Sequence, residues 1–275
     1  MAVDRLGRPS LTVVIAARDE ARRLPALLAQ LAAAPTLIRE VLVVEGGSSD
    51  ATALVATLAG ASLLRTSPGR GHQLALGASL AEAPWLLLLH ADARLPRGWA
   101  ARLARAIGDG DGDRDGVRGG EGVGVRDGGR APRAWYFELA IADPAPALRL
   151  VELMVRLRSR WRQRPYGDQG LLLPLALYRA CGGMRPLPLM EDLDLVERLA
   201  RQARLRSLQL ALRVDGRRWR RRGVWETTLA NLALRRAWRR GVPAAELARR
   251  YYADPADQGA YQKAQRRSWG SRSQP

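Results

Sequence analysis

The chain has 275 residues, of which 47% are hydrophobic, enough for a sizeable core in one large α/β domain or two small ones. The longest apolar run, at 85–89, is too short to cross a bilayer, and the first, at 11–17, leads into charged residues instead of a signal-peptide cleavage site. The single cysteine, Cys181, excludes an internal disulfide and a zinc site built from cysteines. We therefore expect one cytoplasmic domain without a transmembrane segment.

The formal net charge is +18, and it is carried almost wholly by arginine, since Lys263 is the only lysine among 45 basic residues. Much of it lies in 217–222 and 235–240. Clustered cations are typical of proteins that bind phosphate groups in nucleic acids or on membranes. A chain rich in Ala, Leu, Arg and Gly is also what a biased codon supply produces, so the charge alone assigns no partner.

The first half of the chain alternates short apolar runs with longer amphipathic ones. The runs predict strands at 11–17, 41–45, 62–66 and 85–90. Leucines and alanines at three- and four-residue spacing predict helices at 22–34, 50–59, 71–83 and 96–107, the second with Asp50 as its N-cap. Such a βαβ series predicts a mostly parallel sheet with ligands at the carboxyl ends of its strands.

The second half begins with an unusual segment, 108–133, made almost wholly of Gly, Asp, Arg, Glu and Val, which predicts a disordered insert. Beyond it, the pattern predicts the remaining elements. Strands are expected at 135–142, 170–173 and 205–214, and helices at 145–161, from Pro174, at 191–202 and, strongly basic, at 224–240. We expect a domain over 1–253 and a polar, flexible tail over 254–275.

The strand predicted at 41–45 ends in a turn suited to a ligand. Glu45 is followed by Gly46, Gly47, two serines and Asp50. Glycines let a nucleotide approach the backbone, and a carboxylate at a strand end can accept from a ribose hydroxyl or a base N–H. A plain tight turn explains the same residues, because glycine-rich turns commonly join strands to helices.

The next loop, 67–73, precedes another predicted helix. Arg70 and the free backbone N–H groups at the start of that helix could together hold a diphosphate. An ordinary connecting loop is the alternative.

The apolar run 85–90 ends abruptly in His90, and Asp92 follows. A buried strand brings its carboxyl end to the ligand edge of the sheet, and these are the first polar side chains there. Mn²⁺ or Mg²⁺ takes one or two carboxylates and completes its shell with substrate phosphate oxygens and water, so one aspartate suffices. The alternatives are that Asp92 caps the region at Pro96 and that His90 is simply a polar residue at a strand end.

Adjacent carboxylates, Glu191 and Asp192, open the helix predicted at 191–202. Two acids in a first turn complement the helix dipole, which is the simpler explanation for an isolated pair. A general base needs a carboxylate on a rigid element close to a metal-held leaving group, and Asp192 could deprotonate an acceptor hydroxyl. The presence of the three other sites favours the catalytic role.

Together these motifs resemble family 2 glycosyltransferases of the GT-A fold, specifically a compact bacterial branch associated with arsenosugar-type biosynthesis clusters. The likeness covers most of the chain. Its motifs are the opening strand and acidic turn at 11–20, the nucleotide turn at 44–50, the Gly-Arg-x-x-Gln segment at 69–78, the metal site at 89–92, the acceptor-side motifs at 166–170 and 188–192, and a remnant of Gln-x-x-Arg-Trp at 217–219. The chain departs from the family at Glu45, where Asp is usual, at Ala16, where proline is common, and in the insert 108–133.

The resemblance implies one Rossmann-like α/β domain with a mostly parallel sheet, flanking helices and basic C-terminal helices. It implies inverting transfer of a sugar from a nucleoside diphosphate sugar to an acceptor hydroxyl, with Asp192 as the base and Glu191 beside it. Asp92 and His90 would hold a divalent metal, Mn²⁺ or Mg²⁺. The expected substrate-binding residues are Ala17, Glu20, Glu45, Gly46, Gly47, Ser48, Asp50, Arg70, Gln73, Asp168, Gln169, Arg218 and Trp219.

Three other functions fit parts of the sequence. A sugar-nucleotide pyrophosphorylase requires a glycine-rich loop after its first strand. Residues 17–20 of this chain are Ala-Arg-Asp-Glu, which argues against this function. A nucleic-acid-binding protein would use the positive charge, which we discount for the reason given above. The basic helix with Trp225, Leu229, Leu232 and Trp238 could rest on anionic lipid at the inner face of the membrane while the domain stays cytoplasmic.

Overall fold

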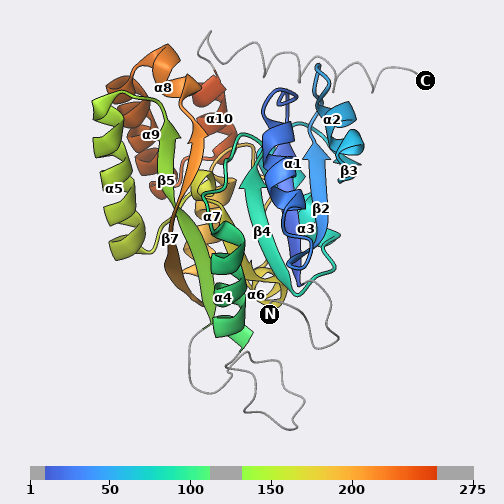
Figure 1. The fold of residues 1–275 in the computed structure, drawn as a ribbon. Coiled ribbons are helices and arrows are strands. Elements are labelled where there is room, and N and C mark those ends of the chain that lie inside the picture. Colours follow the sequence, from blue (N-terminus) through green and yellow to red (C-terminus); the bar gives the residue numbers. More distant parts are fainter. Residues whose placement is uncertain (1–9, 112–131, 253–275) are drawn as a thin grey trace, which may run out of the picture.

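The computed structural model describes residues 10–111 and 132–252, with side chains up to 108 in the first range (Figure 1). Within them a seven-stranded sheet has the order β3-β2-β1-β4-β6-β5-β7. Its strands are β1 (Leu11–Ala17), β2 (Ile38–Glu45), β3 (Ser62–Arg65), β4 (Trp85–His90), β5 (Arg133–Ala142), β6 (Leu171–Pro174) and β7 (Arg204–Asp215). Only β6 runs antiparallel to its neighbours, β4 and β5, so the predicted mostly parallel sheet is confirmed.

Helices cover both faces of the sheet (Figure 1). They are α1 (Leu24–Ala32), α2 (Thr52–Leu58), α3 (Arg70–Ser79), α4 (Trp99–Asp111), α5 (Pro146–Arg162), α6 (Leu175–Ala180), α7 (Glu191–Leu199), α8 (Arg217–Arg222), α9 (Val224–Arg239) and α10 (Ala244–Tyr252). The predicted disordered insert falls mostly outside the described residues, as does the predicted tail from 254. At its edges the prediction was wrong, because α4 continues to Asp111 and β5 begins at Arg133.

The alternation of side chains along β1 explains why helices pack on both sides. Val13 and Ile15 point into one apolar core together with α1 and α4, whereas Val14 points into a second core with α3, α6 and α7. Every residue of β1 is buried, as expected for a parallel strand covered on both faces. A smaller third core joins α5 to β5 and β7.

The close packing of α3 on the sheet depends on Gly77. A Cβ atom at this position would lie 2.3 Å from Cγ1 of Val14 and 2.9 Å from Cγ2 of Val44. No side chain larger than hydrogen fits there without movement of β1 or β2. This contact holds α3 close against β1 and β2, and Arg70 stands in the first turn of the same helix.

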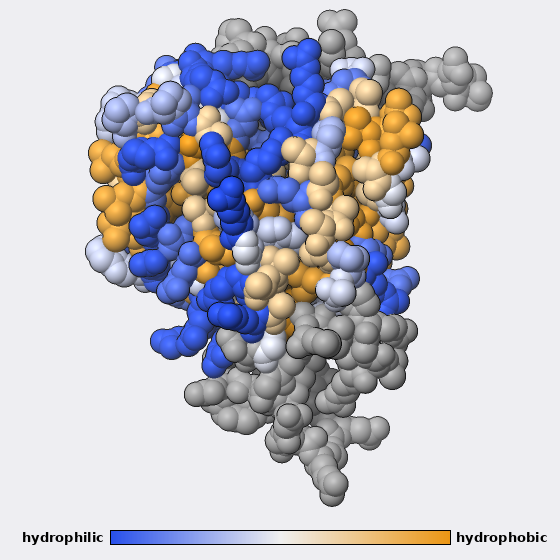
Figure 2. Space-filling view, viewed as in Figure 1, coloured by the Kyte–Doolittle hydropathy of each residue, from blue (hydrophilic) through white to orange (hydrophobic). Residues whose placement is uncertain are grey.

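Hydrophilic and hydrophobic residues occupy different parts of one face of the molecule (Figure 2). Hydrophobic patches lie at two edges, over α5 and over α2, and hydrophilic side chains gather between them (Figure 2). The exposed apolar residues of these two helices are Leu54 and Leu58 on α2 and Leu150, Leu153, Met154 and Trp161 on α5. None of the helices that the structure describes has both the length and the apolar character to span a membrane.

Candidate active site

The carboxyl ends of β1, β2 and β4 meet at one edge of the sheet. Ala17 pairs with Glu45 and Ala16 with His90, which places these strand ends side by side. The buried amide of Gln73, on α3, donates from Nε2 to the carbonyl oxygens of Ala17 at 2.8 Å and Val44 at 2.7 Å. Gln73 therefore joins the ends of β1 and β2, a bracing role that its amide can perform without any substrate.

Two loops at this edge bind each other through their polar side chains. The carboxylate of Asp19 accepts from the backbone N–H of Ser49 at 2.7 Å, and the hydroxyl of Ser48 accepts from the N–H of Asp19 at 3.1 Å. Asp50 accepts from the N–H groups of Ala21 at 3.0 Å and Thr52 at 2.9 Å. The loop after β1 is thereby fixed against the loop after β2, and the side chains of Ser48 and Asp50 brace it.

The predicted N-cap of α2 is displaced by one residue. Ala51 occupies the N-cap position, and Asp50 stands before it, bonded to the first N–H of the helix and to the neighbouring loop. Burial by itself raises the pKa of Asp50, but these hydrogen bonds outweigh it and lower the pKa below its usual value. Glu45, the last residue of β2, is buried, and its carboxylate accepts from the N–H of Ser48 in the turn that follows the strand.

A second group of side chains gathers around Gly167, in the loop that joins α5 to β6. A Cβ atom on Gly167 would lie 3.0 Å from Oδ2 of Asp192 and 3.3 Å from Nε2 of His90. Oδ2 of Asp192 accepts from the N–H of Gly167 at 2.8 Å, and Oδ1 accepts from the N–H of Leu193. Residues 90, 167 and 192, far apart in sequence, thus form one contact cluster, and Asp192 has a fixed orientation in it.

Arg70 lies at the centre of this cluster. Its guanidinium forms an ion pair with Glu191, lies 3.2 Å from Oδ2 of Asp192, and lies 3.0 Å from Nε2 of His90. Because a guanidinium N–H can only donate, Nε2 of His90 accepts and the imidazole is neutral. We expected Arg70 to hold a diphosphate; in this structure it holds the two acids at the start of α7.

The pKa shifts of this cluster follow from burial and from Arg70. Burial, with a further contribution from Arg70, lowers the pKa of His90 to about 4. Burial raises the pKa of Glu191, and the charge of Arg70 opposes that rise. For Asp192 burial also acts upward, but Arg70 and the N–H groups of Gly167 and Leu193 outweigh it, so that its pKa is lowered. Asp192 is therefore an ionised carboxylate beside a neutral histidine at neutral pH.

Backbone strain occurs where α7 begins. Met190, the N-cap residue of this helix, has a φ of 65°, in the left-handed region that side chains other than glycine rarely occupy. Such conformations cluster at functional sites because the surrounding structure must hold them. Here the strained residue directly precedes Glu191 and Asp192.

Asp92 belongs to a neighbouring set of charges. Glu20 is buried and pairs with Arg217 and, at 3.2 Å, with Arg23, while Arg23 also contacts Asp215 at 2.6 Å. Burial and then the charge of Glu20 raise the pKa of Asp92 to about 6, with Arg217 opposing. Arg217 lies in the motif at 217–219, but the run of five arginines and one tryptophan at 217–222 gives no indication in the sequence of which side chain points inward.

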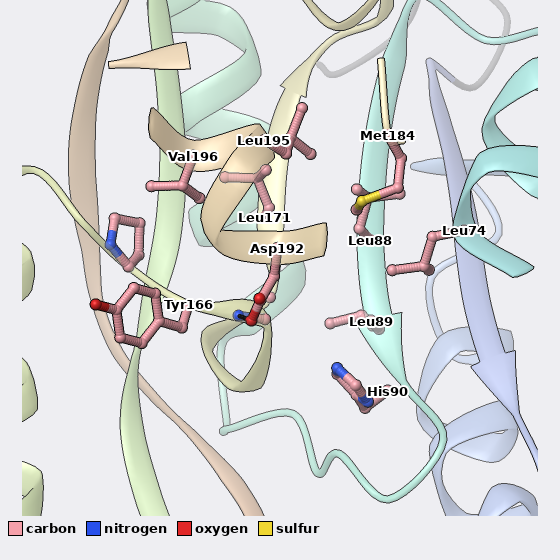
Figure 3. A pocket seen from close by; sticks show the side chains of 13 residues that line it. Leu74, Leu88, Leu89, His90, Tyr166, Leu171, Met184, Asp192, Leu195 and Val196 are labelled. Carbon is pink, nitrogen blue, oxygen red and sulfur yellow. Dashed lines mark hydrogen bonds between the residues drawn. The ribbon is translucent and has the colours of Figure 1, made fainter. Parts of the chain in front are cut away.

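An apolar pocket lies behind His90 and Asp192 (Figure 3). Its walls come from α3, β4, β6 and α7 and from the loop before Gly167. The apolar side chains are Leu74, Leu88, Leu89, Leu171, Met184, Leu195 and Val196, with Tyr166 at one end. This surrounding of hydrocarbon explains why burial lowers the pKa of His90 and why, for Asp192, it opposes the lowering by Arg70 and the two N–H groups.

On the other side of Asp192, an open pocket is bounded by the C-terminal helices. Arg70, Asp168, Asp192 and Arg218 line it together with Tyr251 of α10. The guanidinium carbon of Arg218 lies 4.0 Å from the centroid of the Tyr251 ring, and the guanidinium also donates to the hydroxyl of Tyr251. A helix that the sequence analysis did not predict, α10, thus supplies one wall of the pocket.

The predicted substrate-binding residues fall into two kinds. Arg70, Asp168 and Arg218 line the pocket at Asp192, and Trp219 lines an adjoining one. Gln169 lines that pocket too, but it is buried and its amide bonds Ser159 at 2.9 Å and the carbonyl of Phe137 at 3.0 Å. The residues whose polar groups instead bind neighbouring parts of the protein are Ala17, Glu20, Glu45, Gly46, Ser48, Asp50 and Gln73. Gly47 has a φ of 78°, which makes glycine necessary in that turn.

The arrangement of these sites can be compared with known proteins. The sequence profile described as glycosyl transferase family 2 matches residues 12–179, which includes β1 to β6 and both ligand-edge loops. The chain belongs to this family. The sequence resemblance is therefore confirmed at the level of the family, and the fold is the GT-A fold.

Solved structures support the fold of this glycosyltransferase. Glucosyl-3-phosphoglycerate synthase from Mycobacterium tuberculosis, in complex with Mn²⁺, UDP and glucosyl-3-phosphoglycerate, is 15% identical over 75% of this chain and 72% of that chain, with a TM-score of 0.50. S. aureus TarS 1–349 is 14% identical over 75% of this chain and 60% of that chain, with a TM-score of 0.56. A comparison with curated proteins gave no match.

Within 10–111 and 132–252, no three His, Cys, Asp or Glu side chains are grouped so that they could hold a metal ion by themselves. The sequence predicts a metal site in which Asp92 and His90 are the protein ligands and substrate oxygens are the further ligands. It stays a prediction, with the observation that Nε2 of His90 is occupied by Arg70 in this arrangement.

Proposed function

We propose that this glycosyltransferase moves a sugar from a nucleoside diphosphate donor to an acceptor hydroxyl with inversion at the anomeric carbon. The observation that carries the proposal is the state of Asp192. Its carboxylate is ionised, fixed by two backbone N–H groups, and lines an open pocket beside the ligand edge of the sheet. A general base needs this combination of charge, rigidity and access.

In the reaction, Asp192 takes the proton of the acceptor hydroxyl as the oxygen attacks the anomeric carbon. The bond from that carbon to the diphosphate breaks on the opposite face, which inverts the configuration. Arg70 and Gly167 hold Asp192 in place by an ion pair and a hydrogen bond. Glu191, buried against Arg70, keeps that arginine in position and acts through it.

A divalent metal fits the surroundings of Asp92. The carboxylates of Glu20, Asp168 and Asp215 all act to raise its pKa, so negative charge has accumulated where a cation would relieve it. Asp92 would hold the metal, and the metal would supply neutralising charge for the departing diphosphate. His90 is neutral at physiological pH and becomes a further candidate when Arg70 releases its Nε2.

The proposal is tested with a panel of nucleotide sugars, each added with Mn²⁺, with Mg²⁺ and with a chelator. The synthase of similar fold was solved with UDP and Mn²⁺, which makes UDP-sugars the first to try. We expect one donor to raise the melting temperature only when metal is present, since a ligand that binds the folded state stabilises it. Failure of every donor to stabilise the protein with either metal would contradict the proposal. Proton NMR of the product then reads inversion or retention directly.

The two finer sequence assignments are also proposals. The His-Ala-Asp form of the metal motif, residues 90–92, supports the branch associated with arsenosugar-type clusters. The exposed Trp225 and Leu229 on α9 support contact with anionic lipid at the inner membrane face, whereas Leu232 lines a pocket and is not free for such contact. Co-sedimentation with acidic vesicles tests the second proposal, and an unchanged supernatant fraction would end it.

A further inference from the structure

A second pocket adjoins the one at Asp192. It lies between α5, α9 and the loop 166–169 and encloses about 220 Å³. One part of its wall is apolar, formed by Leu139, Val151, Met154, Val155, Trp219 and Leu232. The other part is cationic, formed by Arg158 of α5 and Arg235 of α9. The two pockets share Tyr166, Asp168, Asn231 and Arg235, so they adjoin along these residues.

Both arginines lie against the ring of Tyr166. The guanidinium carbon of Arg158 lies 3.8 Å from the ring centroid, and that of Arg235 lies 5.4 Å from it. Arg158 also donates to the carbonyl of Arg164 at 3.2 Å and to Oε1 of Gln169 at 3.4 Å. The ring and these neutral acceptors position the guanidinium groups but do not neutralise them.

Neither arginine has an ion pair with any carboxylate in the ranges the structure describes. Other arginines of α5 differ in this respect, since Arg156 and Arg160 bind Glu138 at 3.0 and 2.7 Å. Burial is the main cause that lowers the pKa of both Arg158 and Arg235, with Tyr166 opposing it in each case. Repulsion from Arg235 lowers the pKa of Arg158 further and repulsion from Arg239 lowers that of Arg235, whereas Asp168 and Asp192 act in the opposite direction; both arginines keep their charge at neutral pH. Two half-buried cations held together without a counter-ion cost free energy that a bound anion recovers.

We propose that the acceptor carries a phosphate, which Arg158 and Arg235 bind while the acceptor hydroxyl lies at Asp192. Planar guanidinium groups match the geometry of phosphate oxygens, and two of them line the pocket that adjoins the one at the base. The inference rests on the proposed transferase function, because it names the chemical class of its acceptor. A phosphate could belong to a free phosphate ester or to a lipid headgroup, and both present the same oxygens.

The experiment measures binding directly, by calorimetry on the full chain with glycerol 3-phosphate as the probe and glycerol as its neutral counterpart. The variants are Arg158→Gln and Arg235→Gln, each alone and together. The matched control is Arg162→Gln with Arg236→Gln, which removes the same charge from exposed positions of the same two helices. We expect each site variant to weaken phosphate binding about tenfold, the double variant more, and the control to change it little.

A second arm identifies the source of the phosphate with vesicles of phosphatidylglycerol and, for comparison, phosphatidylcholine. Binding of glycerol 3-phosphate that depends on Arg158 and Arg235 indicates a soluble ester. Binding of phosphatidylglycerol vesicles alone, with the same dependence, indicates a lipid headgroup. Equal loss in the control and the site variants overturns the inference in either arm, as does the absence of any phosphate binding by the unmodified protein.

Failure of this inference is distinguishable from failure of the transferase proposal. Stabilisation of the unmodified protein by a nucleotide sugar and metal does not depend on the acceptor, so it tests the proposed function alone. A protein that binds a donor but treats glycerol 3-phosphate and glycerol alike keeps the transferase function and loses the anionic acceptor.

Discussion

The two sides of the ligand edge are built on different principles. On the side of β1 and β2, polar groups such as those of Asp19, Asp50 and Gln73 are satisfied by nearby backbone. On the side of α5 and α9, Arg158 and Arg235 lie together without an ion-pair partner among the described residues. The polar groups of the first side are satisfied within the protein, whereas the two cations of the second are the ones that we propose bind an anion. The difference fits our proposal that the first side is a preformed donor site and the second an acceptor pocket for an anion.

The largest expected effect concerns the residue between the two sides. We predict that Asp192→Asn lowers the transfer rate by about 10²- to 10⁴-fold, the usual contribution of a general base. The single amide oxygen of Asn can still accept from Gly167 or from Leu193 but not from both, and the ion pair with Arg70 is lost, so the melting temperature should fall modestly while the fold is kept. Product formation and thermal unfolding are measured on the same preparation, with the exposed Glu82→Gln as control. A rate within a few-fold of the unmodified enzyme would remove Asp192 from the mechanism.

The second prediction concerns the packing of α3 on β1 and β2, which supports the preformed side. We predict that Gly77→Ala destabilises the protein by about 1–3 kcal/mol, because the new methyl group meets Val14 and Val44 at less than normal contact distance. Gly108→Ala, where a Cβ atom has no neighbour within 4 Å, is the matched helical control and should stabilise by about 0.5–1 kcal/mol. Urea denaturation measures the free energy of unfolding of both variants. Equal effects of the two substitutions would show that α3 is less tightly held than the structure indicates.

A smaller effect is expected from Asp50, whose contribution to stability depends on pH. Asp50→Asn removes the charge that accepts from Ala21 and Thr52, and we predict a loss of about 1 kcal/mol at neutral pH. Because the pKa of Asp50 is lower in the folded protein than its usual 3.8, the stabilising contribution is complete above that value. It is lost as the pH falls through the folded-state pKa, so the difference between variant and unmodified protein should shrink there. A difference that grows towards acid pH would reverse the assigned sign.

Most of the fold could be predicted because its signals are local. The apolar runs fixed β1 and β4 to the residue, and the βαβ alternation indicated the parallel sheet. The extent of the insert was misjudged because glycine and aspartate in 108–111 have low helix propensity, yet α4 continues through them. The preceding turns of α4 pack against the core through Leu103, Ala106 and Ile107, and the helix continues for one more turn from this anchored part.

The candidate site was predictable in its acids and not in its arginines. Asp92 and Asp192 stood out because a carboxylate directly after a buried strand or at a helix start is conspicuous. Arg158, Arg217 and Arg235 did not, since arginine is so frequent in this chain that no single one is distinctive. Which of them face the site depends on the angle at which α5, α8 and α9 pack, and that is set by long-range contacts.

The account's central claim is that one site holds the donor at Asp92 and deprotonates the acceptor at Asp192. Titration calorimetry of UDP, with and without Mn²⁺, tests it most directly when applied to Asp92→Asn and Asp192→Asn. The account predicts that the first variant loses the metal-dependent part of binding and that the second retains it while unable to transfer sugar. Metal-dependent binding of equal strength in both variants, or UDP binding that ignores the metal, would contradict the claim.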